Sequence, residues 1–421
     1  MHWAVAAEIG MRYTSRDLAF VLGGAIAYEF VRDPDRFAAW LNNLPVSVGA
    51  RKVRDIPDIA FLASVFNSEK LSLEKAVEIL KDPALDADKV QAILYHDNLS
   101  LDRLISIVIY GRLDAEILTD TTITDAVYVV GTLYIASGAT LTMDNQPSVI
   151  VCNKVNNYGI IEKTATGGAG GAAGSSPGAG GNGGGGLIIV TREFYNDSDA
   201  IIQANGADGE DGGTTDTIAS GSSGGNGVIV RIGNDTIGSG GDGGGAFNKG
   251  GHGGGGGDVE SYSGGDGGIV NYSTYSTAKN LAKVIKKAVA DWWIVNEAGK
   301  TPSTVTSFPD CYGAGGGGGA DWDTFGDSGG GGGGGGEIII LSLIFNNTGI
   351  IETNGGKGGN SGEEGSVGNG GGGGGGGLIY ILCSVLQSQG TLRALGGNRG
   401  FGYIDGDEGT DGTAKIYEVK I

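Results

Sequence analysis

Hydrophobic positions recur at helical spacing through much of the first 116 residues. Four consecutive stretches of about 14 residues, which together cover 57–112, each begin with a helix-capping residue and continue with apolar residues three and four positions apart. The capping candidates are Asp58, Ser72, Asp86 and Ser100. Short helices of this kind must bury their apolar faces against neighbours, either as a stacked repeat or as a compact bundle. We expect residues 1–116 to form a helical module.

The hydrophobic period changes from helical spacing to alternation near Ile117. Apolar and polar residues alternate from there to about Met143, with Gly131 and Gly138 at the spacing of turns. Alternation of this kind predicts half-buried β-strands. We expect residues 117–166 to form a β-strand connector.

A longer template with two strands then repeats along the chain. Each copy has a β-rich run, a polar turn and a second short strand, and three copies continue into Asn-Gly or Gly-Gly and a glycine-rich stretch. The copies occupy 149–163, 187–209, 337–359 and 378–400. The second strands begin at Ile160 and Ile201, and again at Ile350 and Thr391, which are 41 residues apart in both cases. This spacing predicts tandem repeats with a longer insertion between the second and third copies.

Glycine composition changes the interpretation of the second half. Glycine makes up 86 of the 421 residues, and almost all of it follows residue 166. The absence of a G-X-Y period and the presence of only 8 prolines exclude collagen. Runs of eight glycines at 329–336 and 370–377 each lead directly into an apolar strand, which a flexible linker would not do. Extended glycine helices with three residues per turn can pair their backbone groups only with neighbours, so we expect them to be packed in layers.

The expected fold class is therefore a multidomain α+β protein. Its helical N-terminal module is followed by a glycine-rich repeat domain at 167–421, in which polyglycine II helices are layered with short β-strands as a sandwich or a solenoid. A helical and aromatic insertion at about 273–325 interrupts this domain.

Charge and the remaining chemistry exclude several function classes. A formal net charge of −20 disfavours nucleic-acid binding. The N-terminus has neither the pattern of a signal peptide nor a run long enough for a membrane helix, so we expect neither. His2, His96 and His252 are widely separated, and no nucleophile elbow or phosphate-binding loop occurs. We therefore expect no enzymatic activity and no cofactor.

Three further features have local interpretations. Cys152 and Cys383 occupy equivalent template positions, which indicates buried structural thiols in similar niches. Asp-Gly clusters recur at 206–213, 238–245 and 403–412. Calcium binding at these clusters is possible, but their spacing is more typical of turns.

The combination of glycine runs, apolar strands and Asn-Gly turns, as in GGGGGGGGEIIIL and GNGGGGGGGGLIYIL, resembles the receptor-binding adhesins at the tips of some phage tail fibres. The segments GTLYIASGATLTM and NNTGIIETNGG also look like glycine-rich β-solenoids of bacterial, archaeal and viral surfaces, and the small helical head is similar to attachment proteins of archaeal viruses. The N-terminal helical repeat departs from the phage adhesins. The resemblance implies a viral spike or tail-fibre adhesin on the virion surface.

The insertion holds the candidate ligand-binding residues. A helix within it places Trp292 on its apolar face and several lysines, including Lys286, largely on the other. Aromatic residues cluster in and after this helix, and aromatic rings stack on sugars and cover apolar area. The candidates are Phe308, Tyr312, Trp322, Phe325 and Trp293.

The expected partners are a host cell-surface glycan or protein receptor, other virion proteins through the N-terminal module, and further copies of the chain, with no nucleic acid. Two alternatives remain open: a structural surface or filament protein without a dedicated ligand, and a glycan-degrading β-solenoid enzyme, whose acids need no fixed local spacing.

Overall fold

The protein is a mixed α+β chain that divides into two compact units. The computed structural model describes residues 33–145, 148–163, 181, 185–212, 223–235, 239–240, 264–302, 314–319, 328–361 and 369–420. The helical unit comprises Met1–Tyr110 and Lys286–Thr306, and the strand unit comprises Gly111–Ile285 and Ser307–Ile421. The helical insertion thus contributes most of its helix to the helical unit, a grouping of distant segments that the sequence pattern did not indicate.

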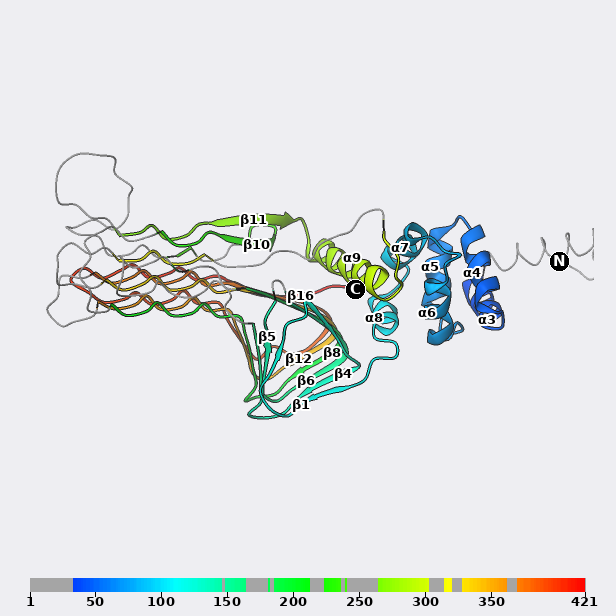
Figure 1. Cartoon of the computed structure of the whole chain (residues 1–421), viewed down its shortest axis with the longest axis horizontal. Helices are drawn as coiled ribbons and strands as arrows, with labels where there is room; N and C mark the ends of the chain where they lie inside the picture. The colour runs from blue at the N-terminus through cyan, green and yellow to red at the C-terminus, as the bar shows by residue number, and fades with distance from the viewer. Residues whose placement is uncertain are drawn as a thin grey trace, which may run out of the picture. The chain divides into compact units, whose positions relative to one another are not determined.

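The helical unit contains short helices that alternate in two rows (Figure 1). The helices are α3 (Pro34–Asn42), α4 (Val46–Asp55), α5 (Ile59–Asn67), α6 (Leu73–Lys81), α7 (Ala87–Tyr95), α8 (Leu101–Val108) and α9 (Ala278–Asn296), of which α9 begins in the strand unit. Each helix from α3 to α6 packs against the helix two further along the chain. Among the described residues, no helix is long and apolar enough to cross a membrane.

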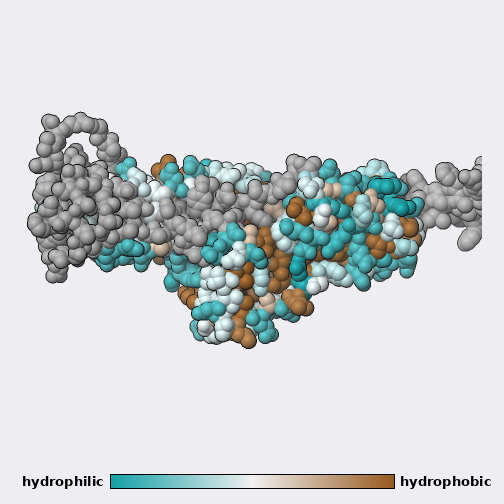
Figure 2. All heavy atoms as spheres, viewed as in Figure 1, coloured by the Kyte–Doolittle hydropathy of each residue, from teal (hydrophilic) through white to brown (hydrophobic). Residues whose placement is uncertain are grey.

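All four predicted helix caps are confirmed. The side chains of Asp58, Ser72, Asp86 and Ser100 each accept a hydrogen bond from the backbone N–H three residues later, at the start of α5 to α8. Each bond satisfies one of the backbone donors that a helix start leaves unpaired. The face of this unit visible in Figure 2 is mostly hydrophilic, as expected when each helix buries its apolar side.

Basic residues at the fifth position of the last three repeats bind carbonyls at or just after the ends of earlier helices. Lys75 Nζ donates to Leu44 O at 3.3 Å, and Lys89 Nζ donates to Ile56 O. Arg103 donates to the carbonyl of Phe66 in the last turn of α5, at 2.8 Å, and to that of Leu71 in the connection to α6, at 2.6 Å. Cations are favourable at helix C-termini because the last carbonyls lack partners within the helix.

The segment that begins at Lys286 makes contacts of the same kind with carbonyls at or just after the ends of α6 and α7. Lys286 Nζ donates to the carbonyls of His96, at 3.1 Å, and Leu99, and Lys300 Nζ donates to Leu80 O at 2.6 Å. Burial lowers the pKa of Lys300, against the opposing effect of two aspartates. Lys286 is therefore buried, at 9% exposure, which corrects the prediction that it faces away from the packed side.

The strand unit consists mainly of two sheets of parallel strands, between which the chain alternates (Figure 1). The large sheet contains, in spatial order, β1 (Ala115–Ile117), β4 (Thr132–Ile135), β6 (Ser148–Asn157), β8 (Gly186–Asn196), β12 (Glu337–Asn347), β14 (Leu378–Ser388) and β16 (Thr413–Glu418), with β3 (Val127–Val129) beside β6. The small sheet contains β15 (Thr391–Arg393), β13 (Ile350–Glu352), β9 (Ile201–Gln203), β7 (Ile160–Lys163), β5 (Thr140–Met143) and β2 (Thr121–Ile123). We call one strand of the large sheet with the following strand of the small sheet a coil.

The spacing of 41 residues corresponds to the pairing of adjacent coils. Ile160 is the partner of Ile201, and Ile350 is the partner of Thr391. The insertion between the second and third copies does not interrupt the sheet, because Ile350 pairs with Ile201. Strand β6 also pairs with β8 along its length, so the strands up to β7, which lie in the segment predicted as a β-strand connector, belong to the same two sheets as the later coils.

The core lies between the two sheets, where apolar side chains from both form one cluster. Cys152 and Cys383 lie in one row across the large sheet, separated by Thr191 and Ser342. Both thiols are fully buried, and burial raises the pKa of Cys152 to about 12 and that of Cys383 to about 11. The prediction that Cys152 and Cys383 occupy equivalent positions of the repeat is confirmed. Thiols with such pKa values are unreactive at neutral pH.

A ladder of buried asparagines closes the turn between the sheets. The side-chain Nδ2 of Asn157 donates to Asn196 Oδ1 at 2.8 Å, and that of Asn196 donates to Asn347 Oδ1 at 2.8 Å. All three side chains are 0% exposed. The turn also requires close backbone approach, because a Cβ at Gly159 would lie 2.2 Å from Ala139 O. This ladder fixes coil against coil through fully paired polar groups.

The glycine segments bond to one another with a period of three residues. The N–H groups of 329, 332 and 335 donate to the carbonyls of 369, 372 and 375, at 2.8–3.0 Å. The N–H groups of 330, 333 and 336 donate to the carbonyls of 210, 207 and 204 instead, at 2.7–2.9 Å. Successive residues of one segment therefore bond to different neighbouring segments, an arrangement that we call the glycine lattice.

Aspartates and asparagines complete the lattice at its surface. Asp208 Oδ1 accepts the N–H of Lys357, and Asp211 Oδ1 accepts that of Asn360, both at 2.7 Å. Asn360 Oδ1 in turn accepts the N–H of Phe401 at 3.0 Å. Asp208 and Asp211 are three residues apart, and each side-chain oxygen replaces the carbonyl that an inner glycine segment would offer. Among the described residues, no group of three or more His, Cys, Asp or Glu side chains is placed to hold a metal ion.

A two-stranded parallel sheet, β10 (Gly227–Ile232) and β11 (Val270–Tyr275), is bonded to the large sheet through side chains. Ile232 N donates to the buried hydroxyl of Tyr380 at 2.8 Å, and Tyr380 donates to Asp235 Oδ2 at 3.1 Å. Lys415 and Tyr417 also donate to Asp235, which is 8% exposed. Burial acts to raise the pKa of Asp235, but these hydrogen bonds together outweigh it and lower the pKa.

The lattice predicts that glycine is required at its inner positions. A Cβ at Gly374 would lie 1.9 Å from Gly333 O, so we expect Gly374→Ala to lower the free energy of unfolding by about 3 kcal/mol. Gly138→Ala is the control, because its Cβ would meet nothing within 4 Å and only its φ of 79° causes strain, worth about 1 kcal/mol. Urea unfolding measures both; equal losses would show that the close approach does not constrain the fold.

The Asp235 cluster predicts a pH dependence of stability. Because its pKa in the folded chain is lowered, the carboxylate contributes stability that is fully present above the ordinary value of 3.8 and is lost as the pH falls through the folded value. We expect wild type to be more stable than Asp235→Asn at neutral pH, and the difference to shrink below pH 3.8. Tyr417→Phe should move this loss to higher pH. A difference that stays constant in urea unfolding across this range would contradict the assignment.

Candidate functional site

The long strands of the large sheet change character halfway along their outer face. In the first half the outward residues are apolar and fully buried, as at Val149, Ile188 and Ile339. In the second half polar, charged and aromatic residues reach solvent there, together with a few aliphatic ones such as Ile344. A shallow groove of about 330 Å³ lies there; its lining includes Lys154, Asn156, Tyr158, Glu193, Tyr195, Ile344, Asn346 and Gln387.

Three tyrosines from successive coils form a ladder, of which Tyr158 and Tyr195 line this groove and Tyr134 lies beside Tyr158. The ring centroids of Tyr134 and Tyr158 are 5.5 Å apart, and those of Tyr158 and Tyr195 are 5.7 Å apart. The rings are tilted by 45° and 53°, and all three side chains are half-buried. The hydroxyl of Tyr195 donates to Asp197 Oδ1 at 2.7 Å, which is the main cause of its raised pKa.

Amide side chains lie in register with the tyrosines, Asn156 between Tyr134 and Tyr195 and Asn346 on the far side of Tyr195. Asn346 pairs in register with Tyr195 on one side and with Ser388 on the other. The register shifts by one residue between Phe345 and Asn346. Gln387 is therefore an extra residue in β14 and forms a β-bulge there. Among the described residues, the buried Oδ1 atom of Asn346 has no hydrogen-bond partner.

Charge in the groove is balanced. Lys154 and Glu193 lie opposite each other in register and form an ion pair at 3.2 Å, with side chains 40% and 52% exposed. The groove is thus an open surface with aromatic faces, amides and no net charge from this pair. It can bind a ligand by stacking and hydrogen bonding, and it holds no nucleophile with an adjacent base.

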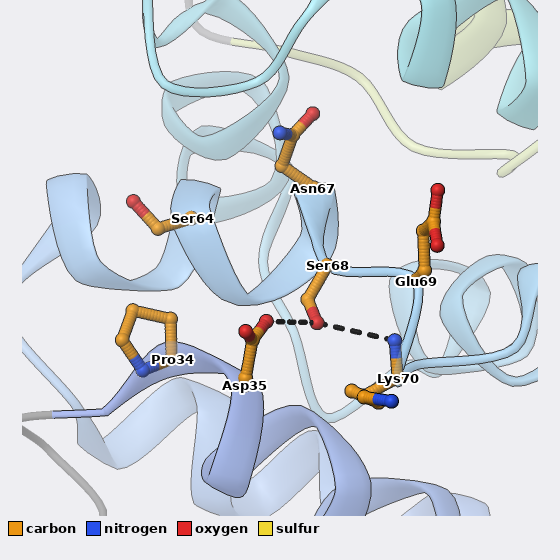
Figure 3. Close-up of a pocket in the computed structure, with 7 residues that line it drawn as sticks. All are labelled: Pro34, Asp35, Ser64, Asn67, Ser68, Glu69 and Lys70. Carbon is orange, nitrogen blue, oxygen red and sulfur yellow. Dashed lines mark hydrogen bonds between the residues drawn. The ribbon is translucent and has the colours of Figure 1, made fainter.

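A second hollow, in the helical unit, is a weaker candidate. Figure 3 shows it beside α3 and α5, lined by Pro34, Asp35, Ser64, Asn67, Ser68, Glu69 and Lys70. Ser68 Oγ donates to Asp35 Oδ1 at 2.6 Å and accepts the N–H of Lys70 at 3.1 Å (Figure 3). Asn67 Oδ1 accepts two bonds from Ser100. Because these polar groups bind each other, the hollow is best explained by helix packing.

Of the candidate residues from the sequence, Trp293 lies in the described part of the chain. Phe308, Tyr312, Trp322 and Phe325 lie outside the described residues. Trp293 is 1% exposed, with Lys81 Nζ 5.9 Å from its ring centroid, so its ring offers no surface to a ligand. Trp292 is only half-buried, and Trp293 is the tryptophan of this helix that packs into the interior.

Sequence reasoning missed the groove because its residues are not periodic in the chain. Tyr134, Tyr158 and Tyr195 become neighbours only through the pairing of β4, β6 and β8. The available signal was weak: Tyr158 and Tyr195 each lie beside the ladder asparagine that ends a long strand.

Comparisons with protein-family models, with curated proteins and with solved structures found no match to this chain. The groove is therefore interpreted from its own geometry.

The ladder predicts an energetic coupling between adjacent rings. We expect a double-mutant cycle of Tyr158→Leu and Tyr195→Leu to give a coupling of about 1 kcal/mol in urea unfolding, as aromatic pairs do. The pair Tyr134 and Tyr195, which lie on either side of Tyr158, is the control and should couple by less than about 0.5 kcal/mol. Equal couplings for the two pairs would mean that the rings do not act as neighbours in solution.

Proposed function

We propose that this chain is an attachment protein, a viral spike or tail-fibre adhesin that binds the surface of a host cell. The observation that carries the proposal is the ladder of half-buried tyrosines, two of which, Tyr158 and Tyr195, line an open groove together with amide side chains. A groove of this kind supports binding without catalysis. The resemblance of the glycine-rich repeats to phage adhesins points to the same function.

The scaffold in this proposal is a β-solenoid whose coils are extended by polyglycine II helices. The hydrogen bonds at every third residue, each to a neighbouring segment, support it, because polyglycine II has three residues per turn and no internal bonds. A scaffold held by backbone bonds and buried asparagines is rigid. Rigidity favours binding because less conformational entropy is lost when the ligand associates.

The remaining parts of the proposal concern location and partners. The protein is on the virion surface, the helical unit binds other virion proteins, and the receptor is a host glycan or protein. The helical repeats support a docking role, since stacked helices offer an extended surface for a partner. Several copies of the chain act together on one particle.

The test is attachment of the full-length chain to intact cells. Fluorescently labelled protein is incubated with a panel of bacterial and archaeal cells, washed and measured by flow cytometry. We expect saturable attachment to at least one cell type, lost in Tyr158→Ala combined with Tyr195→Ala. The full chain is used because residues 286–306 belong to the helical unit, so a fragment starting at 117 would expose Trp293 and Ile294.

Matched variants separate the groove from other contacts. Tyr403→Ala removes a tyrosine that is 67% exposed elsewhere in the strand unit and should leave attachment unchanged. Tyr312→Ala combined with Trp322→Ala tests the receptor contacts expected from the sequence. The attachment proposal fails when the folded chain is retained by no cell type in the panel.

A structural surface or filament protein is the second candidate. Strands β1 and β16 each pair on one side only within the described sheets, so another copy could continue the large sheet at either end. Polymers seen by electron microscopy together with no cell attachment would favour this function. Release of soluble saccharides from the cells would instead favour a glycan-degrading enzyme, which no geometry of the groove supports.

A further inference from the structure

We infer that the tyrosine groove binds a neutral, linear saccharide that lies across the coils, perpendicular to the strands. The inference rests on the proposed attachment function and names the class of ligand. Its basis is the set of side chains at the groove: the rings of Tyr158 and Tyr195, with Tyr134 beside Tyr158, together with amides from several coils.

The rings set the direction and the apolar part of the contact. Tyr158 and Tyr195 line the groove and come from successive coils, and Tyr134 continues the ladder beside Tyr158, so a ligand that stacks on these rings must run across the strands and not along one. Sugar rings have apolar faces formed by C–H groups, and aromatic rings cover such faces well. A chain of sugar units offers one face after another, which a compact ligand does not.

The amides supply the polar part of the contact. Asn156, Asn346 and Gln387 line the groove, and each amide can both donate and accept hydrogen bonds. Asn346 Oδ1 is buried without a hydrogen-bond partner among the described residues, and exchanging the two ends of this amide would turn its acceptor toward the groove. A sugar hydroxyl suits this position in either orientation of the amide, because it donates and accepts equally well.

The charges favour a neutral chain over a polyanion. Lys154 and Glu193 neutralise each other at 3.2 Å within the groove, so no cation is left over to pair with sulfate, phosphate or carboxylate groups. The whole chain also carries a formal charge of −20, which repels polyanions. A protein receptor would need a larger apolar contact than this open groove offers.

The experiment measures binding of defined saccharides to the full-length chain. The probes are neutral oligosaccharides of glucose, mannose, galactose or N-acetylglucosamine, each as a dimer and as a hexamer, with a sulfated hexamer for comparison. Isothermal titration gives the affinity. We expect at least one neutral hexamer to bind, more tightly than its dimer, and the sulfated hexamer to bind more weakly.

Variants assign the binding to the groove. Tyr158→Ala removes the central ring and should weaken binding about tenfold or more, while Tyr158→Phe keeps the ring and should bind like wild type. Asn346→Leu should weaken binding by about fivefold to tenfold. Tyr403→Ala is the control and should have no effect. Circular dichroism confirms that each variant is folded before its affinity is compared.

The inference is overturned when no neutral hexamer binds, when the sulfated hexamer binds more tightly, or when Tyr158→Ala leaves the affinity unchanged. It is also overturned when protease treatment of the cells, and not competition by a neutral hexamer, removes attachment. In each of these cases cell attachment itself can persist, so the proposed function stands. Conversely, a chain that binds a hexamer through Tyr158 but attaches to no cell disproves attachment and leaves the saccharide site in place.

Discussion

The strand unit depends on one constraint, the approach of backbone to backbone in the absence of Cβ atoms. A Cβ at Gly377 would lie 1.9 Å from Gly336 O, so neither a serine nor an alanine fits there. The lattice and the sheet are continuous at this point, because Gly377 N donates to Thr353 O and Leu378 N donates to Gly336 O. The glycine segments therefore hold the first residue of a strand in its register.

The register in turn positions everything on the outer face of the large sheet. Lys154 is the partner of Glu193, and Tyr195 is the partner of Asn346, because strands β6, β8 and β12 begin at matched positions. A slip of one residue would turn these side chains inward and place core residues in solvent. The asparagine ladder requires the same register at the other end of each strand, since Asn157, Asn196 and Asn347 must lie within hydrogen-bond distance of one another.

The features that the sequence predicted correctly are those with a local or periodic signal. Four helix caps, the 41-residue spacing of the second strands and the equivalence of Cys152 and Cys383 all follow from patterns within or between copies of a repeat. The features that it missed join residues without such a relation. Nothing in the chain indicates that Asp235 meets Lys415, or that Lys286 reaches the carbonyl of Leu99. Helical periodicity also predicted that Trp292 lies on the buried face of this helix, whereas Trp293 is the tryptophan that packs into the interior.

The groove is also a feature that the sequence did not indicate, yet its existence follows from the fold. A parallel sheet is usually covered on both faces, and the first halves of β6, β8, β12 and β14 are. Beyond that region the strands continue for several residues with a buried inner face and an exposed outer face, which must carry polar or amphipathic side chains to remain soluble. Tyrosine, asparagine and glutamine meet this requirement while keeping the capacity to stack and to hydrogen-bond. A flat, rigid and half-polar face is thus available for recognition wherever the strands extend beyond their cover.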